Sequence, residues 1–349
     1  MIEQLNLFNY SDYKVAYKIT KPIRLIELFA GIGSQAKALQ RLGANFEHYR
    51  VIEWDKYAMK SYNAVHGTNF ETSDITKIHA SDLGIVDTHK YEYIMTYSFP
   101  CQDLSLAGKG KGMEKGSGTR SGLLWEVERI LLECDELPQV LLMENVPQVH
   151  SKKNIDDFNK WINALAKLGY SNYWQDLNAK QYGIPQNRNR TFMVSIKGDY
   201  TYEFPKPFEL KLRLKDMLED NVDEKYYLSD KQLNYILDCN DVALKSGRNI
   251  NERVVNPEIA KTISCRGAAD QRADVTNFVI DNEEELKVKD LKLRIKNATK
   301  QGYLEATEGD GVDISSRMQW HRGTVQKDSC QTLDTQCNVG VVVKSEFKE

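Results

Sequence analysis

Between residues 23 and 197 the chain alternates short apolar runs with helix-like segments, and this alternation restricts its fold more than any other feature. The runs that predict strands are Ile23–Phe29, Tyr49–Glu53, Tyr91–Tyr97, Val140–Met143 and Phe192–Ile196. The segments that predict helices are Ser34–Leu42, Lys56–His66, Ser121–Cys134 and Ile155–Gly169. Strands separated by helices form a parallel sheet with helices on both faces. We therefore expect an α/β fold with a doubly wound, Rossmann-like sheet domain.

The character of the sequence changes after Lys197. Pro205 and Pro207 mark a linker, and the chain beyond them holds polar stretches and short β-like runs such as Asn277–Ile280 and Val339–Val343. This pattern predicts a sheet domain over residues 23–197 and a second, smaller, irregular β-containing domain over residues 198–349. The first 22 residues lack clear periodicity, so we expect a loosely attached lead-in.

Composition narrows the class of protein. A chain of 349 residues is long enough for two domains. No apolar run approaches the roughly 18 residues that span a bilayer, and the N-terminus lacks the features of a signal peptide, so we expect a cytoplasmic protein with no membrane partner. The six cysteines are scattered without a CxxC pair, which argues against a zinc cluster and a disulfide framework. No metal is expected, and Cys134 and Cys239 are expected to be small buried hydrophobic residues.

Charge is distributed unevenly along the chain. The net charge of −3 carries no global signature of nucleic-acid binding. The segment from Gly183 to Lys215, however, contains seven basic and only three acidic residues. A local basic patch can bind phosphate, although a solvated charged surface explains the same pattern on charge alone.

A glycine-containing turn, Phe29-Ala30-Gly31-Ile32-Gly33, follows the first predicted strand and opens a helix. Glycines there let a ligand approach the backbone, although a tight packing turn has the same sequence. Glu53 ends the next strand, where an acid can bond ribose hydroxyls, and the indole of Trp54 could lie against an adenine. Asp74, after a third candidate strand, could accept from an exocyclic amine. The third glycine of the dinucleotide fingerprint is missing, which favours an adenosine-containing cofactor without a pyrophosphate.

A cysteine follows a proline in the turn Pro100-Cys101-Gln102, at the end of a predicted strand. Ligands of open α/β sheets bind at this end, so Cys101 is a candidate nucleophile. Residues 106–121 follow with five glycines and the cations Lys109, Lys111, Lys115 and Arg120. This stretch is either a flexible surface loop or a lid that closes over a polyanion, and its position beside Cys101 favours the lid.

Two further segments carry charged groups to the same region. Glu144, in Met143-Glu144-Asn145-Val146, follows an apolar run and can act as a general acid; capping the next helix is the structural alternative. Arg188 and Arg190 lie two positions apart, on one side of an extended segment. They could hold a phosphate or a substrate carbonyl, or form surface salt bridges.

Together these segments resemble the DNA cytosine-5 methyltransferases. The ordered set Phe-x-Gly-x-Gly, Glu-Trp, Asp-Ile, Pro-Cys-Gln, Glu-Asn-Val and Gln-x-Arg-x-Arg matches that family from about Ile23 to Ile196. The resemblance implies a domain that binds S-adenosylmethionine, a target-recognition domain, and methylation of C5 of cytosine in duplex DNA in a bacterial or phage restriction–modification setting. Glutamine after the cysteine favours DNA over the transfer RNA of related enzymes.

The resemblance also implies residue roles. Cys101 would attack C6 of a flipped cytosine, Glu144 would hold N3, Arg188 would steady the base carbonyl, and Arg190 the site's carboxylates. The implied cofactor contacts are Phe29, Gly31, Gly33, Glu53, Trp54, Asp74, Ile75 and Pro100. The implied substrate and DNA-loop residues are Gln102, Ser105, Lys109, Lys111, Arg120 and Asn145. The expected partner is double-stranded DNA, bound by a monomer.

The chain departs from the family pattern toward its C-terminal end. Neither a Leu-Thr-Pro-Arg-Glu-like segment nor the following Gly-Asn-x-Val segment is found, although Gln336-Cys337-Asn338-Val339 imitates the second. Three hypotheses therefore stand: an active DNA methyltransferase that tolerates the shortened end, one part of a split enzyme with a complementing chain, and a DNA- or cofactor-binding remnant without activity alone.

Overall fold

The structure is a computed structural model. It describes residues 15–104, 112–227, 257–262, 277 and 279, and five short strands between residues 293 and 341. The chain forms two compact units, residues 1–278 and residues 279–349. The last strand of the central sheet ends at Lys197, next to the domain boundary predicted at residue 198.

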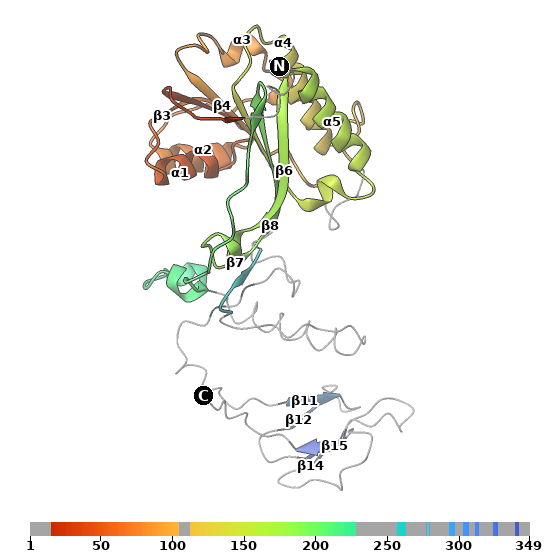
Figure 1. Ribbon diagram of the computed structural model, residues 1–349. Coiled ribbons are helices and arrows are strands. Elements are labelled where there is room, and N and C mark those ends of the chain that lie inside the picture. Colours follow the sequence, from red (N-terminus) through yellow and green to blue (C-terminus); the bar gives the residue numbers. More distant parts are fainter. Residues whose placement is uncertain are drawn as a thin grey trace, which may run out of the picture. The chain divides into compact units, whose positions relative to one another are not determined.

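The central sheet has six strands in the order β3-β2-β4-β5-β8-β6 (Figure 1). Their bounds are β2 Ile23–Leu28, β3 Phe46–Ile52, β4 Glu92–Tyr97, β5 Val140–Asn145, β6 Tyr170–Asn178 and β8 Asn189–Lys197. β2, β3, β4 and β5 are parallel, whereas β8 runs antiparallel to both β5 and β6. The expectation of a fully parallel sheet was therefore wrong at β8. No crossover helix separates β6 from β8, and strands joined by a short connection pair antiparallel.

Helices cover both faces of this sheet, as expected for a doubly wound fold. α1 Ser34–Arg41 and α2 Lys56–His66 lie on one side, and α4 Leu124–Glu133 and α5 Ile155–Lys167 on the other (Figure 1). α3 is a single turn, Ala80–Leu83. The short 3₁₀ helices are η1 Ile75–Lys77, η2 Ser121–Leu123, η3 Pro147–His150, η4 Ala179–Gln181, η5 Leu214–Met217 and η6 Glu224–Tyr226. None of the helices in the described part of the chain combines the length and apolar character needed to cross a bilayer.

The start of α2 shows how local chemistry sets a boundary. The Asp55 side chain accepts hydrogen bonds from the backbone nitrogens of Tyr57 and Ala58, at 2.8 and 2.9 Å. These donors have no partner within the helix, so an N-cap carboxylate satisfies them. Gly67 ends the helix in the left-handed conformation that a C-cap favours.

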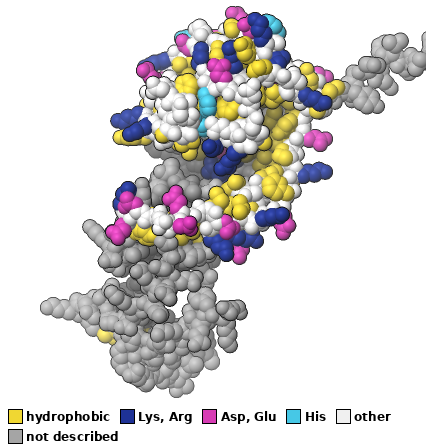
Figure 2. All heavy atoms as spheres, turned by 90° about the vertical axis from the view of Figure 1, so that its left-hand side faces the viewer, with side chains coloured by type: hydrophobic (Ala, Val, Ile, Leu, Met, Phe, Trp, Pro, Cys, Tyr) yellow, Lys and Arg dark blue, Asp and Glu magenta, His cyan; other side chains and the backbone are white. Residues whose placement is uncertain are grey.

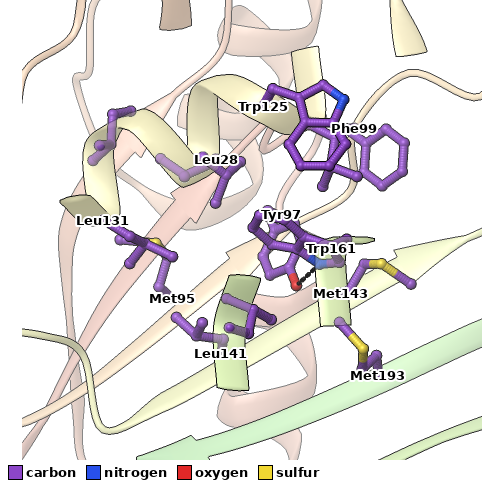
Figure 3. Packing of buried hydrophobic residues seen from close by; sticks show 14 of the residues in the cluster. Leu28, Met95, Tyr97, Phe99, Trp125, Leu131, Leu141, Met143, Trp161 and Met193 are labelled. Carbon is purple, nitrogen blue, oxygen red and sulfur yellow. Dashed lines mark hydrogen bonds between the residues drawn. The ribbon is translucent and has the colours of Figure 1, made fainter. Parts of the chain in front are cut away.

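The main hydrophobic core lies between the sheet and helices α4 and α5. Tyr97 and Trp161 are fully buried, and Trp161 Nε1 donates a hydrogen bond of 3.1 Å to the Tyr97 hydroxyl (Figure 3). Trp125 packs edge-on against Trp161, an arrangement that adds about 0.5–1.5 kcal/mol beyond area burial. Tyr97 is the last residue of β4, so its packing in this core fixes the point at which the following segment leaves the sheet.

The last residues of the lead-in are packed on the sheet domain. β1 Val15–Ala16 pairs in parallel with β9 Tyr200–Thr201, and the Tyr17 hydroxyl donates to the buried carboxylate of Glu92. The expectation of a loose attachment was therefore wrong for residues 15–17. Glu92 is buried in β4, and a buried carboxylate is costly unless it accepts a hydrogen bond. The Tyr17 hydroxyl supplies such a bond, and this contact anchors Tyr17.

The part of the chain after residue 198 contains the expected short strands. β10 Ala260–Lys261 pairs in parallel with β7 Gln186–Asn187. In the second unit, β11 Leu293–Lys296 pairs with β12 Tyr303–Ala306, and β13 Gly311–Asp313 lies between β14 Thr324–Gln326 and β15 Val339–Val341. The run expected to be a strand near residue 339 is thus β15. The run expected over residues 277–280 lies largely outside the described residues.

Candidate active site

The turn after β2 contains two glycines with different tasks. A Cβ on Gly33 would lie 2.3 Å from His66 Nε2 and 2.6 Å from Tyr62 Cε2, so the packing of α2 requires a glycine there. A Cβ on Gly31 would meet nothing within 4 Å. Both glycines have positive φ, as does Phe29. The packing interpretation of the turn therefore applies to Gly33, whereas Gly31 leaves open space beside its backbone.

Glu53 joins three segments at the carboxyl ends of β2 and β3. Its Oε2 accepts from the Gly31 nitrogen and its Oε1 from the Asp55 nitrogen, both at 2.8 Å. Its carbonyl accepts from the Ser73 nitrogen at 2.9 Å. Trp54 beside it is 80% exposed. On the face that carries α1 and α2, hydrophobic side chains lie exposed among charged ones (Figure 2).

Asp74 begins the 3₁₀ helix η1, and the expected third strand before it was wrong, because residues 67–74 form no strand. Its Oδ1 accepts from the Thr76 nitrogen at 3.0 Å and from the Thr76 hydroxyl at 2.8 Å. These hydrogen bonds lower the pKa of Asp74. Its Oδ2 has no hydrogen-bond partner among the described residues and is available to a ligand. Ile75, the next residue, is buried.

The candidate nucleophile Cys101 is half-buried in the segment that follows β4. Asn145 Nδ2 donates to the Phe99 carbonyl at 3.0 Å, and the Ser121 hydroxyl donates to the Pro100 carbonyl at 2.7 Å. Both side chains are buried. They fix the two carbonyls that precede Cys101, so the position of the thiol is set by β5 and by the start of η2. Nothing in the sequence around Ser121 indicates this contact.

Glu144 lies between the two arginines. Its Oε1 is 3.1 Å from Arg190 Nε and 3.6 Å from Arg188 Nη2. The Glu144 and Arg190 side chains are 20% and 17% exposed, and Arg188 is 38% exposed. The pKa of Arg190 is lowered, first by burial and then by the charge of Arg188. The neighbouring charges of Glu144 and Cys101 oppose this shift without cancelling it. The nucleophile, the carboxyl group and the two cations expected from the sequence are therefore brought together.

Comparison with known proteins identifies the family of this chain. A family model described as C-5 cytosine-specific DNA methylase matches residues 23–323. The chain belongs to this family. The match to the family model extends well beyond residue 196, into the region that we expect to recognise the target. As a family member it is a DNA (cytosine-5-)-methyltransferase, and the family's chemistry implies use of S-adenosylmethionine.

Two curated relatives are similar over most of their length. The type II methyltransferase M2.ScrFI of Lactococcus lactis subsp. cremoris is 35% identical in an alignment of 259 positions that covers 60% of this chain and 71% of that protein. The orphan methyltransferase M.SssI of Spiroplasma monobiae is 35% identical in an alignment of 266 positions that covers 60% of this chain and 68% of that protein. The type II name of the first agrees with the restriction–modification setting expected from the sequence.

Solved structures show the same fold. A Spodoptera frugiperda DNMT2 mutant has a TM-score of 0.57 and 20% identity, with 75% of this chain and 76% of that chain covered. Entamoeba histolytica methyltransferase EhMeth has a TM-score of 0.54 and 20% identity, with 71% and 72% covered. The mixed six-stranded sheet is therefore the Rossmann-like fold of methyltransferases.

The loop after Cys101, the candidate nucleophile, is described at its two ends. The Asp103 carbonyl accepts from the Gly112 nitrogen at 3.2 Å, and its Oδ2 accepts from the Arg120 nitrogen at 2.9 Å. The exposed side chains of Gln102 and Arg120 are hydrogen-bonded to each other. Asp103 thus ties the two ends together. The predicted loop residues Ser105, Lys109 and Lys111 lie outside the described residues.

Cys134 is the second cysteine among the described residues, and its thiol is half-buried. Its thiol donates to the Ile130 carbonyl at 3.2 Å, and burial raises its pKa to about 11. A thiol that ionises so reluctantly is a poor nucleophile, in keeping with the structural role expected for Cys134. Cys239 lies outside the described residues. In the described parts of the chain, no cluster of His, Cys, Asp and Glu could hold a metal ion.

Proposed function

We propose that this methyltransferase acts on a cytosine extruded from duplex DNA and forms a covalent bond between Cys101 and C6 of that base. The observation that carries the proposal is the position of Glu144, bonded to Arg190 and paired with Arg188 beside the anchored Cys101 segment. A base inside the helix cannot reach such a group, so the target must leave the stack. In this proposal residues 23–197 catalyse the reaction, and residues 198–349 recognise the target.

The residues around the glycine turn fit S-adenosylmethionine. Each oxygen of Glu53 accepts one backbone N–H and retains a lone pair for a ribose hydroxyl. Asp74 Oδ2 can accept from the adenine amine, exposed Trp54 offers an apolar surface to the ring, and Gly31 leaves its backbone open. Phe29, Gly33, Ile75 and Pro100 complete the proposed site. When bound, S-adenosylmethionine supplies an electrophilic methyl group.

Cys101 takes part in the first and the last step of the proposed reaction. The thiolate of Cys101 forms the S–C6 bond, and the electron pair of the C5–C6 double bond makes C5 nucleophilic. After methylation at C5, loss of the C5 proton to solvent lets the S–C6 bond break. This step restores the double bond and the thiolate. Asn145 and Ser121 contribute by fixing the carbonyls before Cys101.

Glu144 assists the attack at the other side of the ring. Donation of a proton or a hydrogen bond from its carboxyl group to N3 stabilises the charge that develops on the ring when Cys101 adds. Arg190, the more buried cation, orients the carboxyl group. Arg188 is more exposed and is proposed to steady the base carbonyl.

Target recognition is assigned to the region after Lys197. In this region β10 pairs with Gln186–Asn187, beside the two arginines. The Thr262 hydroxyl also donates to the Asn187 carbonyl at 2.7 Å. Gln102 and Arg120, with Ser105, Lys109 and Lys111, are proposed to contact DNA beside the extruded base. A monomer binds the duplex in this proposal.

The test uses the purified full chain, S-adenosylmethionine and duplex DNA that contains 5-fluorocytosine. Fluorine at C5 cannot leave as a proton, so the proposed adduct should accumulate as a protein–DNA complex that survives denaturing electrophoresis. Cys101→Ser should abolish both the complex and the transfer of labelled methyl groups to normal DNA, while Cys134→Ser, the matched control, should retain both. Methyl transfer by Cys101→Ser, or transfer without an adduct, would reject the covalent mechanism.

A second candidate is a split enzyme, and it is favoured by apolar side chains that are incompletely covered on one face of the sheet. Leu142 and Phe192 lie on the same face of the neighbouring inner strands β5 and β8, yet both are only half-buried. Inner strands of α/β sheets are normally covered on both faces. An apolar element from a complementing chain would cover these side chains. Methyl transfer by the purified chain alone would reject this candidate, whereas cofactor binding without transfer would support it.

A further inference from the structure

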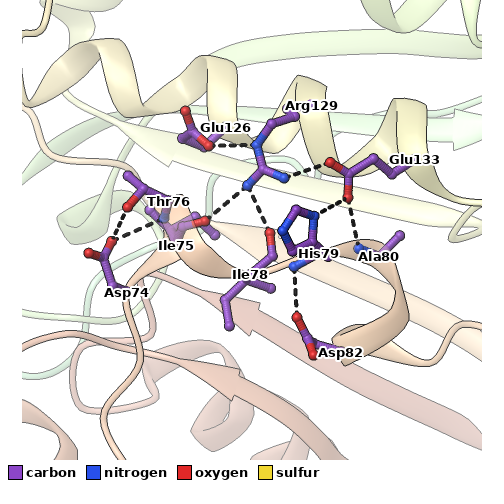
Figure 4. A network of polar contacts seen from close by, with 10 residues as sticks. All are labelled: Asp74, Ile75, Thr76, Ile78, His79, Ala80, Asp82, Glu126, Arg129 and Glu133. Atoms are coloured by element: carbon purple, nitrogen blue, oxygen red, sulfur yellow. Dashed lines mark hydrogen bonds and ion pairs between the residues drawn. The ribbon is translucent and has the colours of Figure 1, made fainter.

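Arg129, in the middle of α4, uses its guanidinium group to hold the segment that carries Asp74 and Ile75. Its Nη2 donates to the Ile78 carbonyl at 2.8 Å and to the Ile75 carbonyl at 3.2 Å (Figure 4). These carbonyls lie at the start and just past the end of η1, which spans Ile75–Lys77. The Ile75 carbonyl also accepts from the Ile78 nitrogen at 3.3 Å, so Arg129 adds a second donor there. The Ile78 carbonyl lies just past the helix, and the guanidinium supplies the donor that the ended helix does not.

The guanidinium is itself held in one orientation. Its Nε donates to Glu126 at 2.8 Å and its Nη1 to Glu133 at 2.7 Å, both on the same helix. Glu133 Oε2 also accepts from the Ala80 nitrogen at 3.1 Å and lies 3.1 Å from His79 Nδ1. A planar guanidinium group that donates to several acceptors is held rigidly, and the single ammonium group of a lysine cannot reproduce this set of hydrogen bonds. The η1 segment is therefore fixed to α4 at a defined place.

We infer that Arg129 is a positioning residue for the adenine end of the cofactor site, an inference that rests on the proposed function of Asp74 and Ile75. Arg129 contacts neither the cofactor nor the base. It fixes the backbone of Ile75, and thereby the direction in which the neighbouring Asp74 presents Oδ2. Ser121, just before α4, fixes the Pro100 carbonyl, so this part of the chain supports both the adenine segment and the nucleophile.

The main test compares Arg129→Met with Lys160→Met. Lys160 forms an exposed ion pair with Asp157 on α5, at 2.9 Å, and matches the loss of a helix-surface cation. The dissociation constant of S-adenosylhomocysteine should rise about tenfold in Arg129→Met, equivalent to about 1.4 kcal/mol, and stay within about twofold in Lys160→Met. The KM for the cofactor should rise by a similar factor, while kcat at saturating cofactor and the KM for DNA stay near the original values.

A double-mutant cycle separates positioning from general stabilisation. If Arg129 acts through Asp74, adding Arg129→Met to Asp74→Ala should cost less affinity than it does in the original chain, because independent sites would add. Additive losses would overturn the inference. Arg129→Lys, which keeps the charge without the planar fork, should lie between the original chain and Arg129→Met, and carries the test if Arg129→Met fails to fold.

The outcomes also separate the inference from the proposed function. An original chain that does not bind S-adenosylhomocysteine would contradict the proposed cofactor site itself. An original chain that binds it, with equal binding by Arg129→Met and Arg129→Lys, would overturn only the role of Arg129. A fall in kcat without a change in the cofactor KM would overturn it as well.

Discussion

The carboxylate of Glu53 accepts a hydrogen bond of 2.8 Å from the backbone nitrogen of Gly31. This bond joins the carboxyl ends of β2 and β3, so one side chain both shapes the glycine turn and faces the proposed ribose position. Because an amide offers only one acceptor oxygen, Glu53→Gln cannot accept from both Gly31 and Asp55. We expect the affinity for S-adenosylhomocysteine, measured by calorimetry, to fall about tenfold or more. Unchanged affinity in Glu53→Gln would contradict the proposed site, and Glu47→Gln, on the neighbouring β3, is the control.

The two glycines of the turn should respond differently to alanine. Gly33→Ala places a methyl group against His66 and Tyr62 and should lower the free energy of unfolding by about 3 kcal/mol, from overpacking and a left-handed alanine together. Gly31→Ala meets open space and should cost only about 1–2 kcal/mol, from its backbone conformation. Urea unfolding of both variants measures the difference. Equal losses would show that α2 yields to the added methyl group.

Removing the carboxyl group at the end of β5 should affect catalysis more than binding. Glu144→Gln leaves Arg188 and Arg190 without their anionic partner and removes the proposed acid, so kcat should fall by roughly 10²–10⁴. DNA binding, followed by fluorescence anisotropy, should remain. Glu128→Gln, which removes a half-buried carboxylate of α4 that is paired with Lys115, serves as the control. A Glu144→Gln enzyme with near-normal kcat would remove Glu144 from the mechanism.

The buried carboxyl group of Glu27 should make stability depend on pH. Burial raises its pKa, against the opposing effect of hydrogen bonds from the Tyr62 hydroxyl and the Ala36 nitrogen. The folded state then binds the proton more tightly than the unfolded chain. The resulting stability is complete below the unfolded pKa of about 4.3 and is lost as pH rises through the folded pKa.

Glu27→Gln has no proton to lose, so its stability relative to the original chain should improve as pH rises from about 5 to 8. Thermal unfolding at several pH values measures this difference. Glu47→Gln, which removes a carboxyl group that is 59% exposed, controls for the change in net charge. A stability difference that stays constant across this range would contradict the raised pKa of Glu27.

Much of the site could be predicted because its chemistry is local. Pro100-Cys101-Gln102 and Glu144-Asn145 follow apolar runs, and the carboxyl ends of neighbouring strands meet at one edge of a sheet. The strand β6 was missed because it lies at the edge of the sheet and carries exposed polar and aromatic residues. Without the alternation of a half-buried strand, its sequence has no clear period.

The sequence by itself determined the alternation of strands and helices, the turns that end the strands, and the residue types presented there, because these depend on neighbours along the chain. Only the tertiary structure decided that β8 runs antiparallel, that Ser121 and Asn145 hold the carbonyls before Cys101, and that Arg129 clamps η1. Such contacts join segments far apart in sequence. Their partners are chosen by packing and by the need to satisfy buried polar groups, which no local pattern records.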